Sequence, residues 1–413
     1  MRDEKGLVRR QAVTAVELPI EEAERKNEYY LSVAKRFGYL RLLTLFILVI
    51  YVLLMIMLCG EDITVSNLKY LLRDINISSS AGEAFSEVDY TAEPIQRFGI
   101  YRGELMYVTG SEVKLFSATG NTGLTSSLSY ESPTVLTTDK YAMIYDLGGY
   151  GFSVYNSFSE LFRESTDGAI ISASLSESGS FAVLTSGTDH KSIVYLYDDD
   201  FNLVSKYSKN EYVTDVILSS DGTKLAMSSV SAAAGAFVTK LTVYEKGAVA
   251  PLTEVTVAGE YPAGLRLTDT GFVLLGTEKV YFYGFDGVRS GIYAPPAEIG
   301  MCDVNGKHTI LVCPENTLAS SNRIVILDSA ATVVYDKVLD EKITDASVSE
   351  YGDAFILTAE RAVMIDIESS AEKAAPSGGT AKRIIAIGDE TAVICASASA
   401  SVMDFSQLTF ISD

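Results

Sequence analysis

Short apolar runs with alternating polar positions repeat along the chain after residue 84, and the same order of runs recurs eight times. Each repeat has an extended apolar run, a polar turn, a second apolar run and a third run that ends in polar residues. Alternation with a period of two residues predicts β-strands, and the turns between them predict hairpins. The first turns of the repeats lie near Gly103, Asp139, Gly179, Gly222, Gly271, Gly306, Gly352 and Asp389.

The repeats are about 35 to 50 residues long, and each contains strand-like runs. This period is typical of a β-propeller in which each repeat supplies one four-stranded blade. The sequence therefore predicts an all-β propeller of eight blades, with seven blades as the alternative. The third strands of the blades are expected to begin at Val113, Phe152, Ile193, Leu241, Val280, Arg323, Ala362 and Ser401.

A closed ring needs one blade built from both ends of the chain, because an open strand edge invites association. Two segments could complete the last blade, the stretch FSEVDYTAE from Phe85 and the C-terminal LTFISD. We expect residues Phe85 to Tyr90 to form the missing strand.

A single hydrophobic segment precedes the repeats, with eighteen uncharged residues from Leu42 to Cys59. Counted from Tyr39, a helix here spans about 30 Å, enough to cross a bilayer core. A cleaved signal peptide is the alternative, but its apolar region is shorter and ends in a small-x-small site. A lipoprotein cleavage box is also disfavoured, since Leu58 stands where a small residue is needed. The segment is therefore predicted to be an uncleaved transmembrane helix.

The charges around this segment predict its orientation. Lys35, Arg36 and Arg41 precede the span, and Glu61 and Asp62 follow it. Positive residues favour the cytoplasmic side, so the N-terminus should be cytoplasmic and the propeller extracytoplasmic at the cell membrane. The predicted organisation is a cytoplasmic tail with a juxtamembrane helix (1–38), a transmembrane helix (39–59), a stalk (60–83) and an extracytoplasmic propeller (84–413).

The formal net charge of −21 is placed unevenly. Up to Arg41 the chain has nine Lys or Arg and seven Asp or Glu, so the remaining residues carry −23. A body this acidic repels phosphate backbones, and nucleic acid is not an expected partner.

Two short segments are candidate binding sites. Asp198, Asp200 and Asn202 have the spacing of the first oxygen ligands of a calcium loop, but Leu203 replaces the required glycine. A solvated hairpin turn is therefore favoured over a metal site. The second segment follows a predicted strand and contains a double glycine. A tight turn that needs positive φ is the favoured interpretation, and a ligand-binding loop is the alternative. Its candidate residues are Asp146, Gly148, Gly149 and Tyr150.

Nothing in the sequence predicts catalysis or a cofactor. Both histidines, His190 and His308, lie in predicted hairpins without the context of a nucleophile. The four cysteines have no metal-site spacing, and an Asn305-Gly306 turn would pair Cys302 with Thr309 rather than with Cys313. Free buried thiols are therefore expected.

The blade turns SSDGTKLA and SESGSFAV are similar to those of WD40-type and TolB-like propellers. The segment KYAMIYDLGGYGFSVYN, from Lys140 to Asn156, adds a D-x-G-G element in the second blade. In this element and its overall order, the chain resembles an uncharacterised family of single-pass membrane proteins of Gram-positive bacteria, a domain of unknown function. The resemblance implies a cytoplasmic tail, one span and a propeller, and it implies no activity.

Together these observations predict a non-catalytic scaffold that is anchored in the membrane. Its propeller would bind a protein or polymer of the cell envelope. The alternative is a ligand sensor that signals through the helix from Ile20 to Phe37.

Overall fold

The structure is a computed structural model that describes residues 20–59, 87–117 and 120–410. The chain divides into two units, Met1–Ser79 and Ser80–Asp413. The predicted stalk (60–83) and the first part of the predicted tail lie outside the described residues. In the first unit, the helix α1 (Ile20–Cys59) is continuous over 40 residues.

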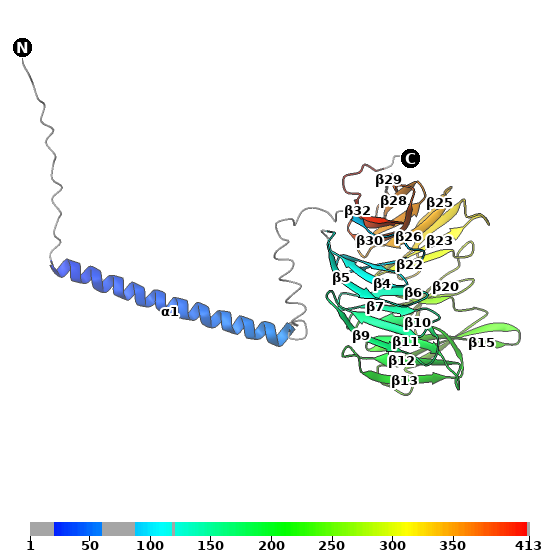
Figure 1. Ribbon diagram of the computed structural model, residues 1–413, viewed down its shortest axis with the longest axis horizontal. Helices are drawn as coiled ribbons and strands as arrows, with labels where there is room; N and C mark the ends of the chain where they lie inside the picture. The colour runs from blue at the N-terminus through cyan, green and yellow to red at the C-terminus, as the bar shows by residue number, and fades with distance from the viewer. Residues whose placement is uncertain (1–19, 60–86, 118–119, 411–413) are drawn as a thin grey trace, which may run out of the picture. The chain divides into compact units, whose positions relative to one another are not determined.

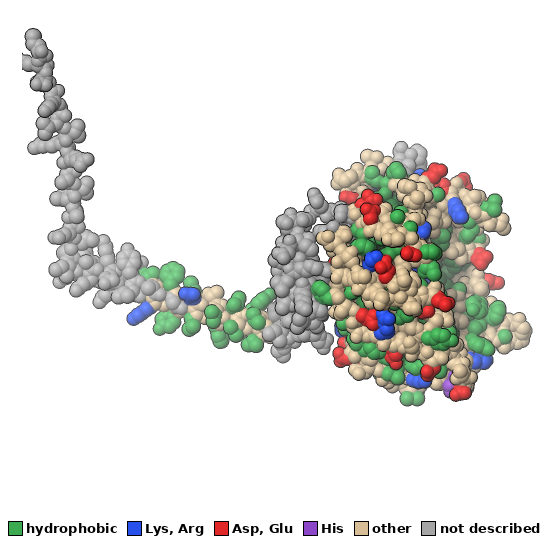
Figure 2. Space-filling view, in the orientation of Figure 1, with side chains coloured by type: hydrophobic (Ala, Val, Ile, Leu, Met, Phe, Trp, Pro, Cys, Tyr) green, Lys and Arg blue, Asp and Glu red, His purple; other side chains and the backbone are tan. Residues whose placement is uncertain are grey.

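The segment Lys35–Leu54 of α1 is long and apolar enough to cross a membrane. Its hydrophobic side chains are exposed in the structure, as Figure 2 shows for the described part of the helix. The cations Lys35, Arg36 and Arg41 lie at the N-terminal end of this apolar segment. A large exposed apolar surface is typical of a site that contacts a membrane or another protein. The exposed side chains of this segment therefore fit a single membrane span.

The second unit is an eight-bladed β-propeller, which confirms the prediction of eight rather than seven blades (Figure 1). Each blade is a four-stranded antiparallel sheet. The strands of blades 1 to 4 are β2 (Arg97–Tyr101), β3 (Glu104–Val108), β4 (Glu112–Phe116), β5 (Thr122–Ser127); β6 (Pro133–Thr137), β7 (Ala142–Asp146), β8 (Gly151–Tyr155), β9 (Glu160–Ser165); β10 (Ile170–Leu175), β11 (Phe181–Ser186), β12 (Ser192–Tyr197), β13 (Leu203–Lys209); β14 (Tyr212–Leu218), β15 (Lys224–Ala233), β16 (Ala236–Glu245) and β17 (Thr253–Ala258).

Blades 5 to 7 follow the same order, whereas blade 8 takes its fourth strand from the beginning of the propeller. The strands of these blades are β18 (Gly264–Leu267), β19 (Gly271–Leu275), β20 (Val280–Gly284), β21 (Arg289–Tyr293); β22 (Met301–Asn305), β23 (His308–Pro314), β24 (Asn322–Leu327), β25 (Val333–Leu339); β26 (Ile343–Val348), β27 (Asp353–Thr358), β28 (Arg361–Asp366), β29 (Glu372–Pro376); β30 (Ala381–Gly388), β31 (Thr391–Ala396), β32 (Ser399–Asp404) and β1 (Val88–Asp89).

We call the four strand positions of a blade A to D, from the innermost strand to the rim. The A strands contact one another around the ring, as β10 and β14 do. B strands such as β3 and β27 are buried at every residue, because both of their faces pack on neighbouring blades. D strands such as β9 are mostly exposed. The predicted third strands all occupy position C.

The core consists of eight apolar clusters, one at each interface between neighbouring blades. In the cluster between blades 1 and 2, Met106 and Leu115 meet Ile144 and Tyr155. Each blade thus buries both faces, and removal of one blade would expose two clusters. Because burial of apolar area is the main favourable term in folding, the propeller is stable only as a complete ring.

The ring closes at blade 8, where the N-terminal strand β1 pairs with β32. Val88 lies opposite Ala400, and Asp89 lies opposite Ser399. The predicted clasp is therefore confirmed for its described residues, and the C-terminal stretch from Leu408 to Phe410 forms no strand.

Tyr90 secures this closure. Its side chain is buried and stacks on Tyr107 of blade 1, with ring centroids 4.5 Å apart. Its hydroxyl oxygen lies 2.7 Å from the carbonyl oxygens of both Ala396 and Ser399, which share its single proton as acceptors. Burial raises the pKa of Tyr90 well above its usual value, so the phenol stays a neutral donor.

The predicted register around Cys302 is wrong. The turn consists of Gly306 and Lys307, so Asn305 pairs with His308 and Cys302 with Leu311. Gly306 has a φ of 58°, which suits the first turn position of a two-residue hairpin, where glycine is favoured. Cys302, Cys313 and Cys395 are free, as expected; Cys313 and Cys395 are buried, whereas Cys302 is half-buried.

We predict that Tyr90→Ala lowers the free energy of unfolding of the full chain by about 3 to 4 kcal/mol, since a large buried ring is removed. Tyr90→Phe should cost about 1 kcal/mol, because only the hydroxyl hydrogen bonds are lost. The exposed Tyr351 supplies the control, and Tyr351→Ala should change stability by less than about 0.5 kcal/mol. Chemical denaturation measures all three variants, and equal stability of Tyr90→Ala and Tyr351→Ala would contradict the closure described above.

Candidate functional site

The propeller has two faces that carry different connections. In an antiparallel blade, the A–B and C–D turns lie on one face, and the B–C turns and the connections to the next blade lie on the other. We call these the A–B face and the B–C face. The hydrogen bond from Lys140 Nζ to Asp199 Oδ2 joins an A–B turn to a C–D turn, which shows that both share one face.

The predicted calcium-like cluster lies on the A–B face, in the C–D turn of blade 3. Asp198 Oδ1 accepts hydrogen bonds from the backbone N–H groups of Asp200 and Asn202, at 3.1 and 2.8 Å. Asp199 is paired with Lys140 at 2.9 Å, which lowers the pKa of its carboxyl group. Within residues 20–59, 87–117 and 120–410, no group of three or more His, Cys, Asp or Glu side chains is placed to hold a metal ion.

The same turn geometry recurs at the end of other C strands. In each case an aspartate side chain accepts the N–H group two residues further on, which forms an Asx turn. In blades 3, 5, 6 and 7 this turn lies in the C–D hairpin, whereas in blade 8 no D strand follows along the chain. These aspartates are Asp198, Asp286, Asp328, Asp366 and Asp404. The recurrence favours a structural role for the turn at Asp198, as the sequence indicated.

The second candidate segment, Asp146 to Tyr150, is the B–C turn of blade 2. Asp146 is buried and accepts the N–H of Ser132 at 2.7 Å. Gly148 has a φ of 82°, and its N–H donates to the carbonyl of Ile170 in blade 3. A Cβ on Gly149 would come within 2.0 Å of Asp146 Oδ2.

The structure thus brings Asp146, Gly148, Gly149 and Tyr150 together in one turn, in which the first three serve the fold. Tyr150 differs, because it is 56% exposed on the B–C face. It is the one member of this group whose side chain is available to a partner.

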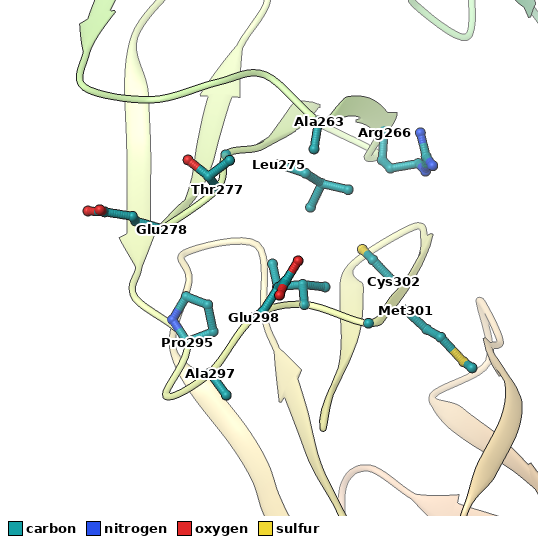
Figure 3. A pocket seen from close by; sticks show the side chains of 13 residues that line it. Ala263, Arg266, Leu275, Thr277, Glu278, Pro295, Ala297, Glu298, Met301 and Cys302 are labelled. Carbon is teal, nitrogen blue, oxygen red and sulfur yellow. The ribbon is translucent and has the colours of Figure 1, made fainter. Parts of the chain in front are cut away.

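The B–C face also has a cavity of about 600 Å³ between blades 5 and 6, which we call the blade 5–6 cavity. Its wall is formed by the B–C turn of blade 5 and the long connection from β21 to β22. Figure 3 shows Glu298 and Cys302 pointing toward the space beside Leu275, whereas Glu278 points away. In the sequence, this wall is marked by the Pro295-Pro296 pair in the long connection between β21 and β22.

The chemistry of the blade 5–6 cavity suits binding rather than covalent catalysis. Burial raises the pKa of the Cys302 thiol to about 12, so the group is protonated at neutral pH and is a poor nucleophile. Arg266 lies 3.8 Å from Asp215, which offsets its charge. Neither histidine lines this cavity, since His190 lies in the B–C turn of blade 3 and His308 follows an A–B turn on the opposite face.

A buried carboxylate orders this part of the B–C face. Glu260 accepts hydrogen bonds from Tyr281 Oη at 3.1 Å, Thr277 Oγ1 at 3.2 Å and the N–H of Glu278 at 3.1 Å. The backbone carbonyl of Glu260 accepts from Thr239 Oγ1 in the neighbouring blade at 2.8 Å. These bonds tie the B–C turn of blade 5 to β16, since a buried carboxylate needs several donors.

The most prominent feature of this face is the hairpin of β15 and β16 in blade 4. Both strands are 10 residues long, and the hairpin projects from the propeller in Figure 1. Its tip is rich in alanine, and Phe237 near the tip is 53% exposed. The Phe237 ring contacts the half-exposed Tyr261 edge-on at 5.5 Å. Leu318, in the B–C turn of blade 6, is 80% exposed.

Exposed aromatic and aliphatic side chains of this kind are typical of protein contact surfaces. The fold and this face define the class of protein: an eight-bladed β-propeller with one candidate membrane helix and a face that carries apolar projections. Residues 84–404 match DUF5711, a family of unknown function, and the chain belongs to this family. No curated protein has a significantly similar sequence.

Solved propellers with different sequences share the fold. The designed Ika8 protein has 11% identity and a TM-score of 0.59, with 78% of this chain and 99% of that chain covered. Saccharomyces cerevisiae Sqt1 has 10% identity and a TM-score of 0.56, with 80% and 99% covered. BamB from Moraxella catarrhalis has 10% identity and a TM-score of 0.54, with 78% and 99% covered. At these identities the likeness concerns the fold alone.

We predict that Gly149→Ala lowers the free energy of unfolding by about 2 kcal/mol, since the new methyl group displaces the buried Asp146 carboxylate. Gly388→Ala is the control, because a Cβ there meets its nearest neighbour at 3.8 Å. Denaturation curves of the two variants test this difference. If Gly149→Ala is as stable as the control, the double glycine has no structural role and is free to be a ligand loop.

Proposed function

We propose that this protein is a membrane-anchored, non-catalytic scaffold whose propeller binds a protein or polymer of the cell envelope through the B–C face. The single observation that carries the proposal is the projecting β15–β16 hairpin with its exposed Phe237–Tyr261 pair. A ring stabilised by its own blade interfaces does not need the tip of this hairpin, which extends beyond the pairing of β15 with β14 and of β16 with β17. We therefore assign this apolar projection to the binding of a partner.

The acidic surface supports a partner that is not a nucleic acid. Negative side chains are spread over the propeller, as Figure 2 shows for one face. The projecting residues Phe237 and Leu318 are uncharged, so contact there avoids the repulsion that the acidic body would impose on polyanions.

The extracytoplasmic location is part of the proposal and rests on charge. Lys35, Arg36 and Arg41 precede the uncharged run that begins at Leu42, and cations favour the cytoplasmic side of a span. Anchoring would hold the propeller near the membrane and raise its effective concentration toward envelope partners there.

A ligand sensor is the second candidate function, and the continuity of α1 favours it. The helix from Ile20 to Cys59 joins the predicted juxtamembrane segment to the apolar span without a break. Such a helix can transmit a movement only if a ligand binds two states of the protein differently. The scaffold is preferred because it needs no second state of the propeller.

Topology is tested with single cysteines in a Cys59→Ser background. We predict that Asp89→Cys reacts with a membrane-impermeant thiol reagent in intact cells, and that Glu17→Cys does not. Background labelling should be low, because burial raises the pKa of Cys302, Cys313 and Cys395 to about 12, 11 and 12. At pH 7.5 these thiols therefore remain protonated and unreactive. The reverse pattern would place the propeller in the cytoplasm.

Partner binding is tested with a photo-crosslinking amino acid at single positions in intact cells. We predict one or more discrete crosslinked products from positions 237 and 318 on the B–C face. Matched exposed positions 249 and 351 lie in turns of the A–B face and should give none. Equal crosslinking from both faces, or crosslinking from the A–B face alone, would contradict the proposed binding face.

A further inference from the structure

Three cationic side chains meet at the B–C end of the central channel. Arg97 begins the A strand β2, and Lys382 and Arg383 lie at the start of the A strand β30. They line a cavity of about 500 Å³ together with Pro94, Gln96, Phe98, Thr134 and Val135. We call it the blade 8–1 cavity.

The wall of the blade 8–1 cavity contains no carboxylate, in contrast to three other cavities of the propeller. The blade 5–6 cavity has Glu278 and Glu298 in its wall. A cavity of about 710 Å³ on the A–B face is bordered by six acidic residues, Glu350, Asp353, Asp366, Glu368, Asp389 and Glu390. In a chain with a net charge of −21, a purely cationic cavity is a local exception that attracts anions.

Within the part of the chain that the structure describes, two of the three cations lack a carboxylate partner. Arg383 Nε lies 3.9 Å from Asp345 Oδ2, a long ion pair. Among the described residues, no carboxylate lies within ion-pair distance of Arg97 or Lys382. Arg97 Nη1 donates to the carbonyl of Gln96 at 3.1 Å, and Lys382 Nζ donates to Gln96 Oε1 at 2.9 Å. These neutral acceptors orient the cations and leave their charge uncompensated.

Gln96 fixes the position of Lys382 because its own side chain is held firmly. It is buried, and its Nε2 donates to the carbonyl of Ser397 at 2.8 Å and to Tyr107 Oη at 3.2 Å. The Gln96 amide oxygen therefore faces Lys382 across the junction of blades 8 and 1. A preorganised donor binds an anion more tightly than a mobile surface lysine, since less side-chain entropy is lost.

We propose that the blade 8–1 cavity binds a doubly charged oxyanion through Arg97 and Lys382. The chemistry is that of a phosphate group or of a dicarboxylate. A guanidinium offers a fork of donors that matches such oxygens, and the ammonium adds a second positive charge. The two uncompensated charges match a dianion better than a monoanion. This inference does not rest on the proposed scaffold function, because it requires neither a membrane nor a protein partner.

The test is isothermal titration of the full chain in a nonionic detergent at constant ionic strength. The probes are inorganic phosphate, succinate and acetate. We expect the wild-type protein to bind at least one dianion and to bind acetate at least about tenfold more weakly. If the cavity binds phosphate but not succinate, its ligand carries a phosphate group. If it binds both, the cavity recognises the double negative charge of either dianion.

The site variant is Arg97→Gln/Lys382→Gln, in which the dianion affinity should fall at least about tenfold, because hydrogen bonds to charged groups are lost. The matched control is Lys206→Gln/Arg289→Gln, which removes the same charge from the outer strands β13 and β21. The control should keep the wild-type affinity, and both variants should keep the wild-type melting temperature, since all four side chains are exposed. Absence of dianion binding by the wild-type protein, or equal affinity in the site and control variants, would overturn the proposal.

Discussion

Pairing of the two-residue strand β1 with β32 is the constraint on which the rest of the structure depends. It converts a row of eight sheets into a ring in which every blade has two neighbours. Seven of the eight apolar clusters join blades that are consecutive in the chain, whereas the cluster between blades 8 and 1, which contains Val88, Tyr90 and Tyr107, forms only when the ring is closed. The Gln96 that positions Lys382 lies beside this closure, so the blade 8–1 cavity is also a product of it.

Polar side chains on the A strands reinforce the ring from inside. Oxygen atoms of one A strand accept backbone N–H groups of the next, as Asp215 Oδ2 does from Leu265 at 2.7 Å and Asp345 Oδ2 does from Ile384 at 2.9 Å. Burial raises the pKa of Asp345, and Arg383 opposes this shift. Because these bonds fix the A strands, the B–C turns are free to vary, and the projecting hairpin and the blade 5–6 cavity arise there.

The sequence predicted the features that depend on local patterns. Alternation and turn residues located the eight third strands, and the need to close the ring identified the segment around Val88. The turn at Gly306 was placed one residue too early, because the register depends on which turn position takes positive φ. Contacts across the ring were not predictable, since Lys382 and Gln96 are far apart in the sequence and no local pattern connects them. The blade 5–6 cavity was also missed, although the Pro295-Pro296 pair marks one part of its wall.

The central claim is that the B–C face of an extracytoplasmic propeller is covered by an envelope partner. Hydroxyl-radical footprinting tests it directly by comparing intact cells with the purified protein. The account predicts lower oxidation of Tyr150, Phe237 and Leu318 in cells, with unchanged oxidation of Val249 and Tyr351 on the A–B face. All five side chains are exposed in the isolated propeller. Equal oxidation of the B–C residues in cells and in solution would contradict the account.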